Sequence, residues 1–332
     1  MHLSKTQCQQ LLPASRADLI TGCSDVSVDF PISESAGILI FESDGQNFIA
    51  PYVKSKGIQR AQSKDGVTAK LLSNSLPDGL RSTMHIGTYS HERFISVDQS
   101  NESVVLDESI IVKWQLTANK SLGAHKEEVL ADNAFEYLPE LLGNIYWNEN
   151  LLASINKYIQ GTTDGWTWCK EKAEENDLGM WLDNLALLTK EMHRCLEGLI
   201  HGDFHVGQIL KEHHKDKFWV IDFEGDPLTN IAENSDLLHD IASMCASFFH
   251  VGAVAIKYGA EVDQIKEWVV QAESTFTAKY FGDKTFDVSA LHSLMRTLEN
   301  RELKYADKFL PQWRYAPEFA ITYMEELGYG SN

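Results

Sequence analysis

Short apolar stretches separated by turn-forming residues fill the first third of the chain. Five of them are residues 37–42, 47–53, 94–97, 104–106 and 109–114. Asp44-Gly45 stands between the first two, and an Asp-Gly pair flanked by apolar runs is typical of a tight hairpin turn. Asp107-Glu108 takes the same place before the last stretch. The pattern predicts a series of antiparallel β-hairpins.

The spacing of apolar residues becomes helical from about Lys126 onward. Apolar side chains recur every three or four positions in residues 125–135, 184–196, 237–252, 263–280 and 289–309. A β-rich part followed by a helical part predicts an α+β fold with two lobes. The turn-forming sequence Gly-Thr-Thr-Asp-Gly at residues 161–165 is the expected hinge between them.

Composition and charge narrow the classes of function that are open to the chain. Its 332 residues are 43% apolar and 23% charged, which is typical of a folded globular protein with a sizeable core. The formal charge of −19 disfavours binding to nucleic acid or to anionic lipid, because both rely on Lys and Arg side chains that neutralise phosphate. It does not exclude ATP, since one lysine and a magnesium ion can outweigh the overall charge locally.

The sequence does not favour a membrane-bound or secreted protein. No apolar run approaches the roughly 18–20 residues of a membrane span, and residues 1–16 lack the apolar core of a signal peptide. The five cysteines are scattered and never spaced as Cys-x-x-Cys, which argues against a disulfide framework and against a zinc site. We therefore expect a cytoplasmic protein.

The strongest chemical signal is His-Gly-Asp-Phe-His-Val-Gly-Gln at residues 201–208, followed by Asp-Phe-Glu at 222–224. Phosphoryl transfer from ATP to a hydroxyl needs one carboxylate at the acceptor hydroxyl and oxygen ligands that hold magnesium against the phosphates. Asp203 and Gln208 have the spacing of the corresponding Asp and Asn of protein kinases. Asp222 ends an apolar run, as the Asp of the kinase Asp-Phe-Gly does. We therefore predict that Asp203 and Asp222 face one another across a cleft and share the magnesium ion. The alternative is a surface turn followed by an exposed carboxylate.

A lysine and a helix carboxylate are expected in the same chemistry. Lys113 ends the apolar strand 110–113, where a kinase has the lysine that contacts the phosphates, and the next helix offers Glu127 and Glu128 as its partner. A lysine in this position is more often a solvated edge residue, so its assignment depends on the motif at Asp203.

The loop at residues 99–103 has small hydroxyl and amide side chains but no glycine. Such side chains in a tight hairpin can direct N–H groups and hydroxyls towards anionic oxygens. The residues alone leave an ordinary hairpin and a phosphate cradle equally open.

These motifs resemble those of the maltokinase and glucosamine kinase group, within the aminoglycoside phosphotransferase-like kinase superfamily. The resemblance runs from about residue 90 to about residue 325 and is most specific at 201–208 and 222–227. It implies a protein-kinase-like fold with two lobes. Residues 1–90 would form an N-terminal cap, 91–160 a β-rich nucleotide-binding lobe, and 161–332 a helical lobe for catalysis and acceptor binding.

The resemblance also implies residue roles, with ATP and Mg²⁺ as cofactors. Asp203 would be the catalytic base, and Gln208 and Asp222 the metal ligands. Asp240, in an otherwise apolar helix, would be a structural partner of the catalytic loop. The residues implied in nucleotide binding are Lys113, Gln99, Ser100, Asn101, Ser103, Glu128 and Tyr158.

The expected acceptor is a small sugar or amino sugar, held by aromatic faces and by polar groups on its hydroxyls. Candidate acceptor residues are Asp203, Glu224, Glu302, Tyr305, Gln312 and Trp313. Alternatively, Trp313 only packs the last helix against the core. The leading expectation is glucosamine to glucosamine 6-phosphate. Maltose to maltose 1-phosphate and an aminoglycoside acceptor are the alternatives, and a nucleotide-binding pseudokinase is the non-enzyme alternative. The sequence leaves open the oligomeric state and the choice between ATP and GTP.

Overall fold

The chain divides into two units in the computed structural model, which describes residues 1–55, 57–83, 87–95, 102–213, 215, 217–225 and 236–330. Unit 1 comprises Met1–Ala124 and Pro139–Gln160, and unit 2 comprises His125–Leu138 and Gly161–Asn332. The segment His125–Leu138 is thus part of unit 2, although strands of unit 1 precede and follow it in the sequence.

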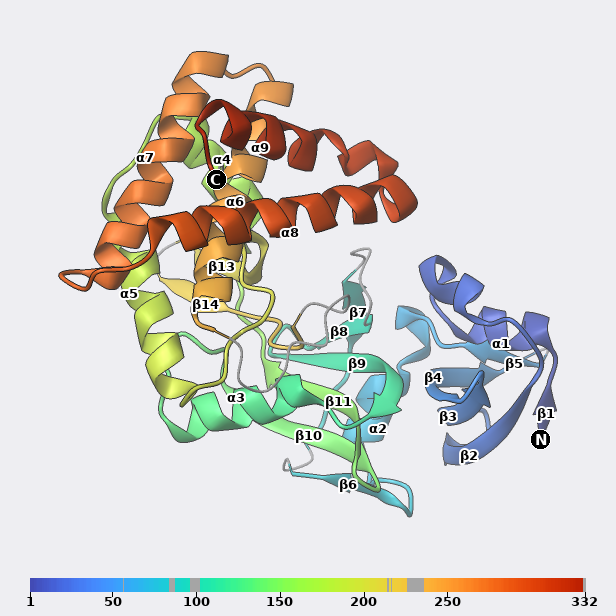
Figure 1. The fold of residues 1–332 in the computed structure, drawn as a ribbon. Helices are drawn as coiled ribbons and strands as arrows, with labels where there is room; N and C mark the ends of the chain where they lie inside the picture. The colour runs from blue at the N-terminus through green and yellow to red at the C-terminus, as the bar shows by residue number, and fades with distance from the viewer. Residues whose placement is uncertain are drawn as a thin grey trace. The chain divides into compact units, whose positions relative to one another are not determined.

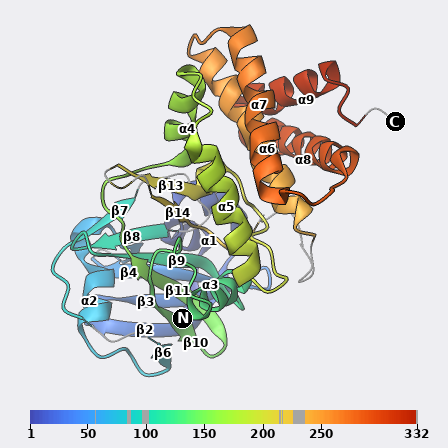
Figure 2. The same ribbon diagram turned by 90° about the vertical axis from the view of Figure 1, so that its left-hand side faces the viewer.

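Unit 1 is built on an antiparallel sheet (Figures 1 and 2). Among the described residues the strand order is β1-β2-β3-β4-β9-β11-β10-β6, with β5 paired to β4, β8 to β9 and β7 to β8. The strands are β1 (His2–Leu3), β2 (Ser24–Ser33), β3 (Ala36–Ser43), β4 (Gln46–Lys54), β5 (Ile58–Arg60), β6 (Leu80–Ser82), β7 (Glu92–Ile95), β8 (Glu102–Leu106), β9 (Ile110–Asn119), β10 (Leu141–Trp147) and β11 (Asn150–Lys157).

The side chains of β3 alternate between two hydrophobic cores. Ile38 and Ile40 pack in the cluster that includes Leu71 of helix α2 (Val67–Ser73), whereas Phe41 packs with Leu11 of helix α1 (Lys5–Leu11). Successive side chains of a strand point to opposite faces, so both faces of the sheet are covered here. This explains why β3 reads as a continuous apolar run.

The predicted hairpins are confirmed. Ser43 pairs with Gln46 across a two-residue turn in which Asp44 has φ 50° and Gly45 has φ 78°. Two left-handed residues in succession match the twist of the flanking strands, and Gly adopts this conformation without steric cost. The hairpin of β10 and β11 and the helices α1 and α2 were not expected from the sequence pattern.

Unit 2 is mainly helical, with a small antiparallel sheet of β12 (Thr162–Thr163), β13 (Ile209–Glu212) and β14 (Phe218–Val220). All five predicted helical segments are confirmed. The expected hinge at 161–165 contains β12 and Asp164, the N-cap of α4. The helices are α3 (Leu122–Asp132), whose first turn lies in unit 1, α4 (Gly165–Glu174), α5 (Met180–Cys195), α6 (Leu238–Lys257), α7 (Val262–Phe281), α8 (Val288–Phe309) and α9 (Tyr315–Glu326). Short 3₁₀ turns are η1 (Ala14–Leu19), η2 (Ser63–Asp65), η3 (Val206–Gln208) and η4 (Pro311–Trp313).

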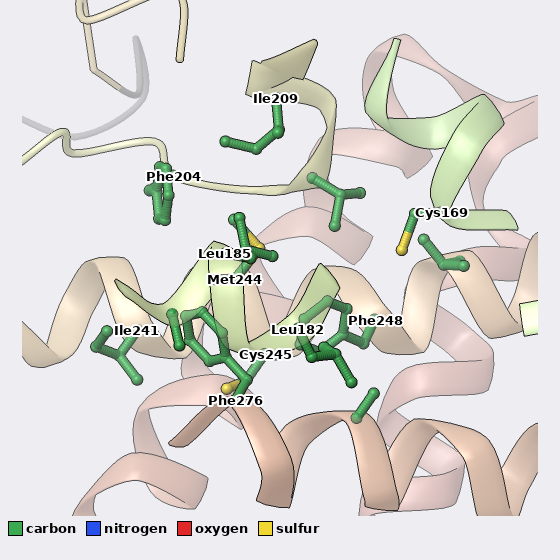
Figure 3. Packing of buried hydrophobic residues seen from close by; sticks show 14 of the residues in the cluster. Cys169, Leu182, Leu185, Phe204, Ile209, Ile241, Met244, Cys245, Phe248 and Phe276 are labelled. Atoms are coloured by element: carbon green, nitrogen blue, oxygen red, sulfur yellow. The ribbon is translucent and has the colours of Figure 1, made fainter. Parts of the chain in front are cut away.

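Helix α6 is the core helix of unit 2 and contacts α4, α7, α8 and α9 (Figure 1). Its length and composition would suffice to cross a membrane, but 78% of its most apolar window is buried inside the protein. Figure 3 shows Ile241, Met244, Cys245 and Phe248 of α6 among buried side chains from neighbouring elements. Phe204 lies in this same cluster, so the core directly supports the segment that carries Asp203.

Candidate active site

The predicted carboxylates lie on two linked segments of unit 2: the Asp203 loop (residues 201–208) and the Asp222 loop (residues 221–225). The β13–β14 hairpin joins them, and the N–H of Ile221 donates to the carbonyl of Gln208 at 3.0 Å. Gln208 therefore lies beside the residue that precedes Asp222. Carboxylate and amide oxygens are ligands that Mg²⁺ accepts, so the donor chemistry of this pair fits the expected ion.

Buried phenylalanines fix the direction of both loops. Phe204 and Phe223 are fully buried, and the ring of His201 contacts both, with centroids 5.3 and 4.7 Å away. The adjacent Asp203 and Asp222 are only half-buried. Asp222 also has φ 66°, a left-handed conformation that costs energy in a residue other than glycine and is held by the surrounding structure.

His201 links the two loops through its ring. Its Nε2 donates to the carbonyl of Ile221 at 3.0 Å, and its Nδ1 accepts from the N–H of Asp203 at 3.3 Å. Burial lowers the pKa of His201 to about 4, against the opposing effect of Asp240. The ring is therefore neutral at physiological pH and acts as a structural bridge.

The carboxylate of Asp240 holds the start of the Asp203 loop. It is fully buried and accepts hydrogen bonds from the N–H groups of His201 (2.7 Å) and Gly202 (2.8 Å) and from His193 Nε2 (3.0 Å). Burial would raise the pKa of Asp240, but the bonds from His193 and Gly202 lower it below its ordinary value. His193 in turn contacts the hydroxyl of Tyr280 at 2.7 Å. The expected structural role of Asp240 is confirmed by these contacts.

His205 places a ring nitrogen beside Asp203. Its Nδ1 accepts from the N–H of Gly207 at 3.1 Å. Its Nε2 lies 3.7 Å from Asp203 Oδ2 and 3.4 Å from Nε2 of the Gln208 side chain. The predicted base, the predicted metal ligand Gln208 and His205 thus form one polar group.

An aromatic cluster adjoins this group. The ring of Trp166 stacks on His205 and on His250, with centroids 5.4 and 6.3 Å away, and meets the edge of Trp313 at 5.7 Å. Trp313, from η4, also contacts the ring of His250 at 5.9 Å. These side chains come from α4, α6 and η4, which are far apart in the sequence.

Glycines allow the close packing of α4 on the Asp203 loop. A Cβ on Gly165 would overlap the carbonyl oxygen of Val206, and a Cβ on Gly207 would overlap the indole nitrogen of Trp166. The absence of a side chain at both positions lets the backbones approach and brings Trp166 against His205.

Carboxylates from α8 adjoin the aromatic cluster. Glu299 is buried and contacts His250 Nε2 at 2.7 Å. Burial would lower the pKa of His250, but Glu299 and Glu302 raise it. Glu302 is half-buried; burial, together with the charges of Glu299 and Asp203, raises its pKa to about 7 against the effects of His250 and Arg301. Glu302 is therefore close enough to Asp203 to feel its charge.

The other predicted acceptor residues take different positions. Tyr305 packs against Phe309 of α8, with ring centroids 5.0 Å apart, and Gln312 is exposed. Glu224 is half-buried in the Asp222 loop, where its charge acts on Lys126. Among these, Trp313 and Glu302 are the ones that the structure brings beside the group around Asp203.

Unit 1 carries the predicted nucleotide-binding residues Lys113 and Ser103. They are register partners on β9 and β8, and Ser154 of β11 is opposite Lys113 on the other side, so the three side chains share one face of the sheet. Gln99, Ser100 and Asn101 lie outside the described residues. Glu128, on α3, is half-buried in unit 2.

The side chain of Tyr158 is held within unit 1. Arg93 donates to its hydroxyl at 2.9 Å and lies over its ring, and the N–H of Tyr158 donates to the carbonyl of Ser109 at 2.9 Å. The N–H and the hydroxyl of Tyr158 therefore both have partners within unit 1.

Sequence reasoning did not single out Lys126, Trp166, His250 and Glu299 as site residues. The spacing could have indicated that Lys126 is buried, because it lies four positions before Leu130 and therefore on the same, core-facing side of α3. The other three depend on contacts between distant segments.

The chain is similar to glucosamine kinases both in amino-acid sequence and in fold. The chain is 26% identical over 397 residues to a glucosamine kinase of Streptacidiphilus jiangxiensis, with 90% of each chain covered. A solved glucosamine kinase structure has a TM-score of 0.77 at 22% identity and covers 96% of this chain and 97% of its own. The resemblance to the glucosamine kinase group is confirmed. The similarity extends over nearly the whole chain, so it includes both units.

A further solved structure is a glucosamine kinase in complex with glucosamine, ADP and inorganic phosphate. It has a TM-score of 0.70 at 22% identity and covers 95% of this chain and 98% of its own. No family model matches the chain. The expected α+β fold, with a β-rich N-terminal lobe and a helical C-terminal lobe, is that of these glucosamine kinases.

The first prediction concerns Asp240. In Asp240→Asn an amide N–H₂ replaces one oxygen and faces a donor, so we expect the free energy of unfolding to fall by about 3–5 kcal/mol at neutral pH. Ionised Asp240, with a folded pKa below its ordinary 3.8, stabilises the fold above that pH and loses this effect as the pH falls through the folded pKa. The difference from wild type should therefore narrow in acid, as measured by urea unfolding.

Asp263→Asn is the matched control, since Asp263 is exposed at the start of α7. Its unfolding free energy should stay within about 0.5 kcal/mol of wild type. An Asp240→Asn protein as stable as wild type at neutral pH would contradict the role given to this carboxylate.

Proposed function

We propose that the protein is an ATP- and Mg²⁺-dependent kinase that phosphorylates glucosamine to glucosamine 6-phosphate. The observation that carries the proposal is that Asp203, Gln208 and Asp222 lie on two loops that are hydrogen-bonded to each other and anchored in one core, and that an aromatic cluster adjoins the Asp203 loop. The similarity to glucosamine kinases over nearly the whole chain supports it. The presence of all three residues disfavours a pseudokinase.

Asp203 acts as the base in this proposal. Its carboxylate accepts a hydrogen bond from the acceptor hydroxyl, orients the oxygen for attack on the γ-phosphorus, and takes the proton as the bond to phosphorus forms. His205 Nε2 lies 3.7 Å from this carboxylate. His201, Asp240 and the core below Phe204 keep the loop in place.

Gln208 and Asp222 are the proposed magnesium ligands. When bound, the ion neutralises charge that accumulates on the phosphate oxygens. In unit 1, Lys113 and Ser103 would contact the phosphates, and their common face of the sheet supports this assignment. Gln99, Ser100, Asn101, Glu128 and Tyr158 remain proposed nucleotide-binding residues through the family resemblance.

An amino sugar is the proposed acceptor because the cluster beside Asp203 is acidic. Glu302 is half-buried, and burial together with the charges of Glu299 and Asp203 raises its pKa, so its carboxylate gains from a cationic ammonium group. The ring of Trp313 supplies an apolar surface for the C–H face of a sugar. Tyr305, Gln312 and Glu224 remain candidates from the resemblance alone. The five cysteines have free thiols, and we infer a reducing cytoplasm as the location.

The second prediction concerns the acceptor. In a coupled assay of ADP release, glucosamine should turn over with a higher kcat/KM than glucose, maltose or an aminoglycoside, because it alone among the simple sugars of this set offers a cation to Glu302. Turnover of maltose without turnover of glucosamine would contradict the acceptor and leave the kinase activity standing.

The third prediction concerns the base. Asp203→Asn should lower kcat by about 100- to 10,000-fold, the range expected when a general base is lost, while Mg·ATP binding measured by calorimetry stays within threefold of wild type. Asp263→Asn serves as the control and should keep wild-type kcat. Activity near the wild-type level in Asp203→Asn would remove Asp203 from this role.

The fourth prediction concerns Glu302. In Glu302→Gln the ammonium loses a charged partner, so the ratio of kcat/KM for glucosamine to that for glucose should fall about 10- to 100-fold. Because the pKa of Glu302 is about 7, its carboxyl gains a proton below that pH and the wild-type preference should weaken there. The variant should lack this pH dependence.

Glu267→Gln, at an exposed position of α7, is the control and should leave the ratio unchanged. An unchanged ratio in Glu302→Gln as well would show that the acceptor's amino group lies elsewhere.

A further inference from the structure

Lys126 is a lysine at a core position of helix α3. It is 4% exposed and lies between the exposed His125 and the half-buried Glu127, four residues before the fully buried Leu130. Lysine is almost never fully buried unless its ammonium group has partners, because removal from water is costly. The ammonium group of Lys126 must therefore have partners inside the protein that offset the cost of its burial.

The ammonium group of Lys126 is bound to both loops of the candidate site. Nζ donates to the carbonyl of His201 at 2.8 Å and to the carbonyl of Phe223 at 3.1 Å. His201 begins the segment that carries Asp203, and Phe223 directly follows Asp222. A single side chain thus contacts the backbone of the two loops next to the two predicted catalytic carboxylates.

The surroundings of Nζ fit this bridging position. A Cβ on Gly225 would lie 3.7 Å from both Lys126 Nζ and the His201 carbonyl oxygen, so a residue without a side chain borders the ammonium group. Burial lowers the pKa of Lys126, and the charges of Asp240, Glu224 and Asp203 oppose this effect. The ammonium group is therefore placed where several carboxylates of the site offset its desolvation.

We propose that Lys126 is a positioning residue for the transfer: it fixes the backbone that carries Asp203 relative to the backbone that carries Asp222. The role rests on the proposed kinase function. The other hydrogen bonds given above between the two loops are formed by Ile221, whose carbonyl accepts from His201 Nε2 and whose N–H donates to the carbonyl of Gln208. They hold the Asp222 loop before Asp222, whereas Lys126 holds it at Phe223, after Asp222, so the backbone is fixed on both sides of that carboxylate. Sub-ångström changes in such an arrangement are expected to lower turnover.

The experiment compares Lys126→Met, Lys126→Arg and the control Lys190→Met at an exposed position of α5. Met keeps an apolar stem of similar length but has no N–H donor. We expect Lys126→Met to lower kcat at least 30-fold with the KM for glucosamine within threefold of wild type, and to raise the Mg²⁺ concentration needed for half-maximal rate. Arg can still donate to both carbonyls and should recover a part of kcat. Lys190→Met should match wild type.

Hydrogen exchange read by mass spectrometry gives a result that does not need activity. In Lys126→Met, exchange should increase in peptides that cover residues 201–208 and 221–225, and remain unchanged in unit 1. If both loops keep wild-type protection, or if kcat stays within threefold of wild type while only stability falls, the positioning role is overturned. If wild type phosphorylates no sugar but both loops exchange faster in the variant, the tie stands and the proposed function fails.

Discussion

The geometry of the candidate site depends on one buried carboxylate. Asp240 accepts hydrogen bonds from the N–H groups of His201 and Gly202 and from a ring nitrogen of His193, and all four residues are buried. A buried ion that has lost a partner costs far more than a complete pair contributes, so each of these donors needs the others in place. The backbone just before Asp203 is therefore fixed by α6. Most other side chains of this helix are buried in the core of unit 2.

Around that carboxylate, the two loops are joined by polar side chains and anchored by apolar ones. Phe204 and Phe223 enter the core next to Asp203 and Asp222, so each buried ring leaves the adjacent acid half-buried at the edge of the core. Neutral His201 supplies a donor and an acceptor at once, which a protonated ring could not do. Rigid support of this kind is what phosphoryl transfer needs, because positioning and electrostatics supply most of its catalysis.

Local patterns in the sequence were sufficient to predict many of the strands and helices and the loop that carries Asp203. Alternation and turn residues predicted the hairpin at Asp44-Gly45, helical spacing predicted α5 to α8, and the motif around Asp203 predicted the loop that His201 and Asp240 hold. The sequence could not show that His125–Leu138 joins unit 2, since helix packing is decided by distant partners. For the same reason the sequence could not show that Lys126 contacts the Asp203 and Asp222 loops. The assignment of nucleotide and metal ligands stays a prediction.

The charges beside Asp203 also bear on the choice of acceptor. Glu299 is already offset by His250, to which it is bonded at 2.7 Å, so its interaction is complete before any ligand arrives. Glu302 is different: burial, together with the repulsion of its negative form by Glu299 and Asp203, raises its pKa to about 7. A neutral sugar would leave that repulsion unchanged or hold Glu302 protonated. A cationic amino sugar instead removes it, and the gain grows as burial lowers the local dielectric. The acidic cluster is thus better suited to an ammonium group than to hydroxyls alone.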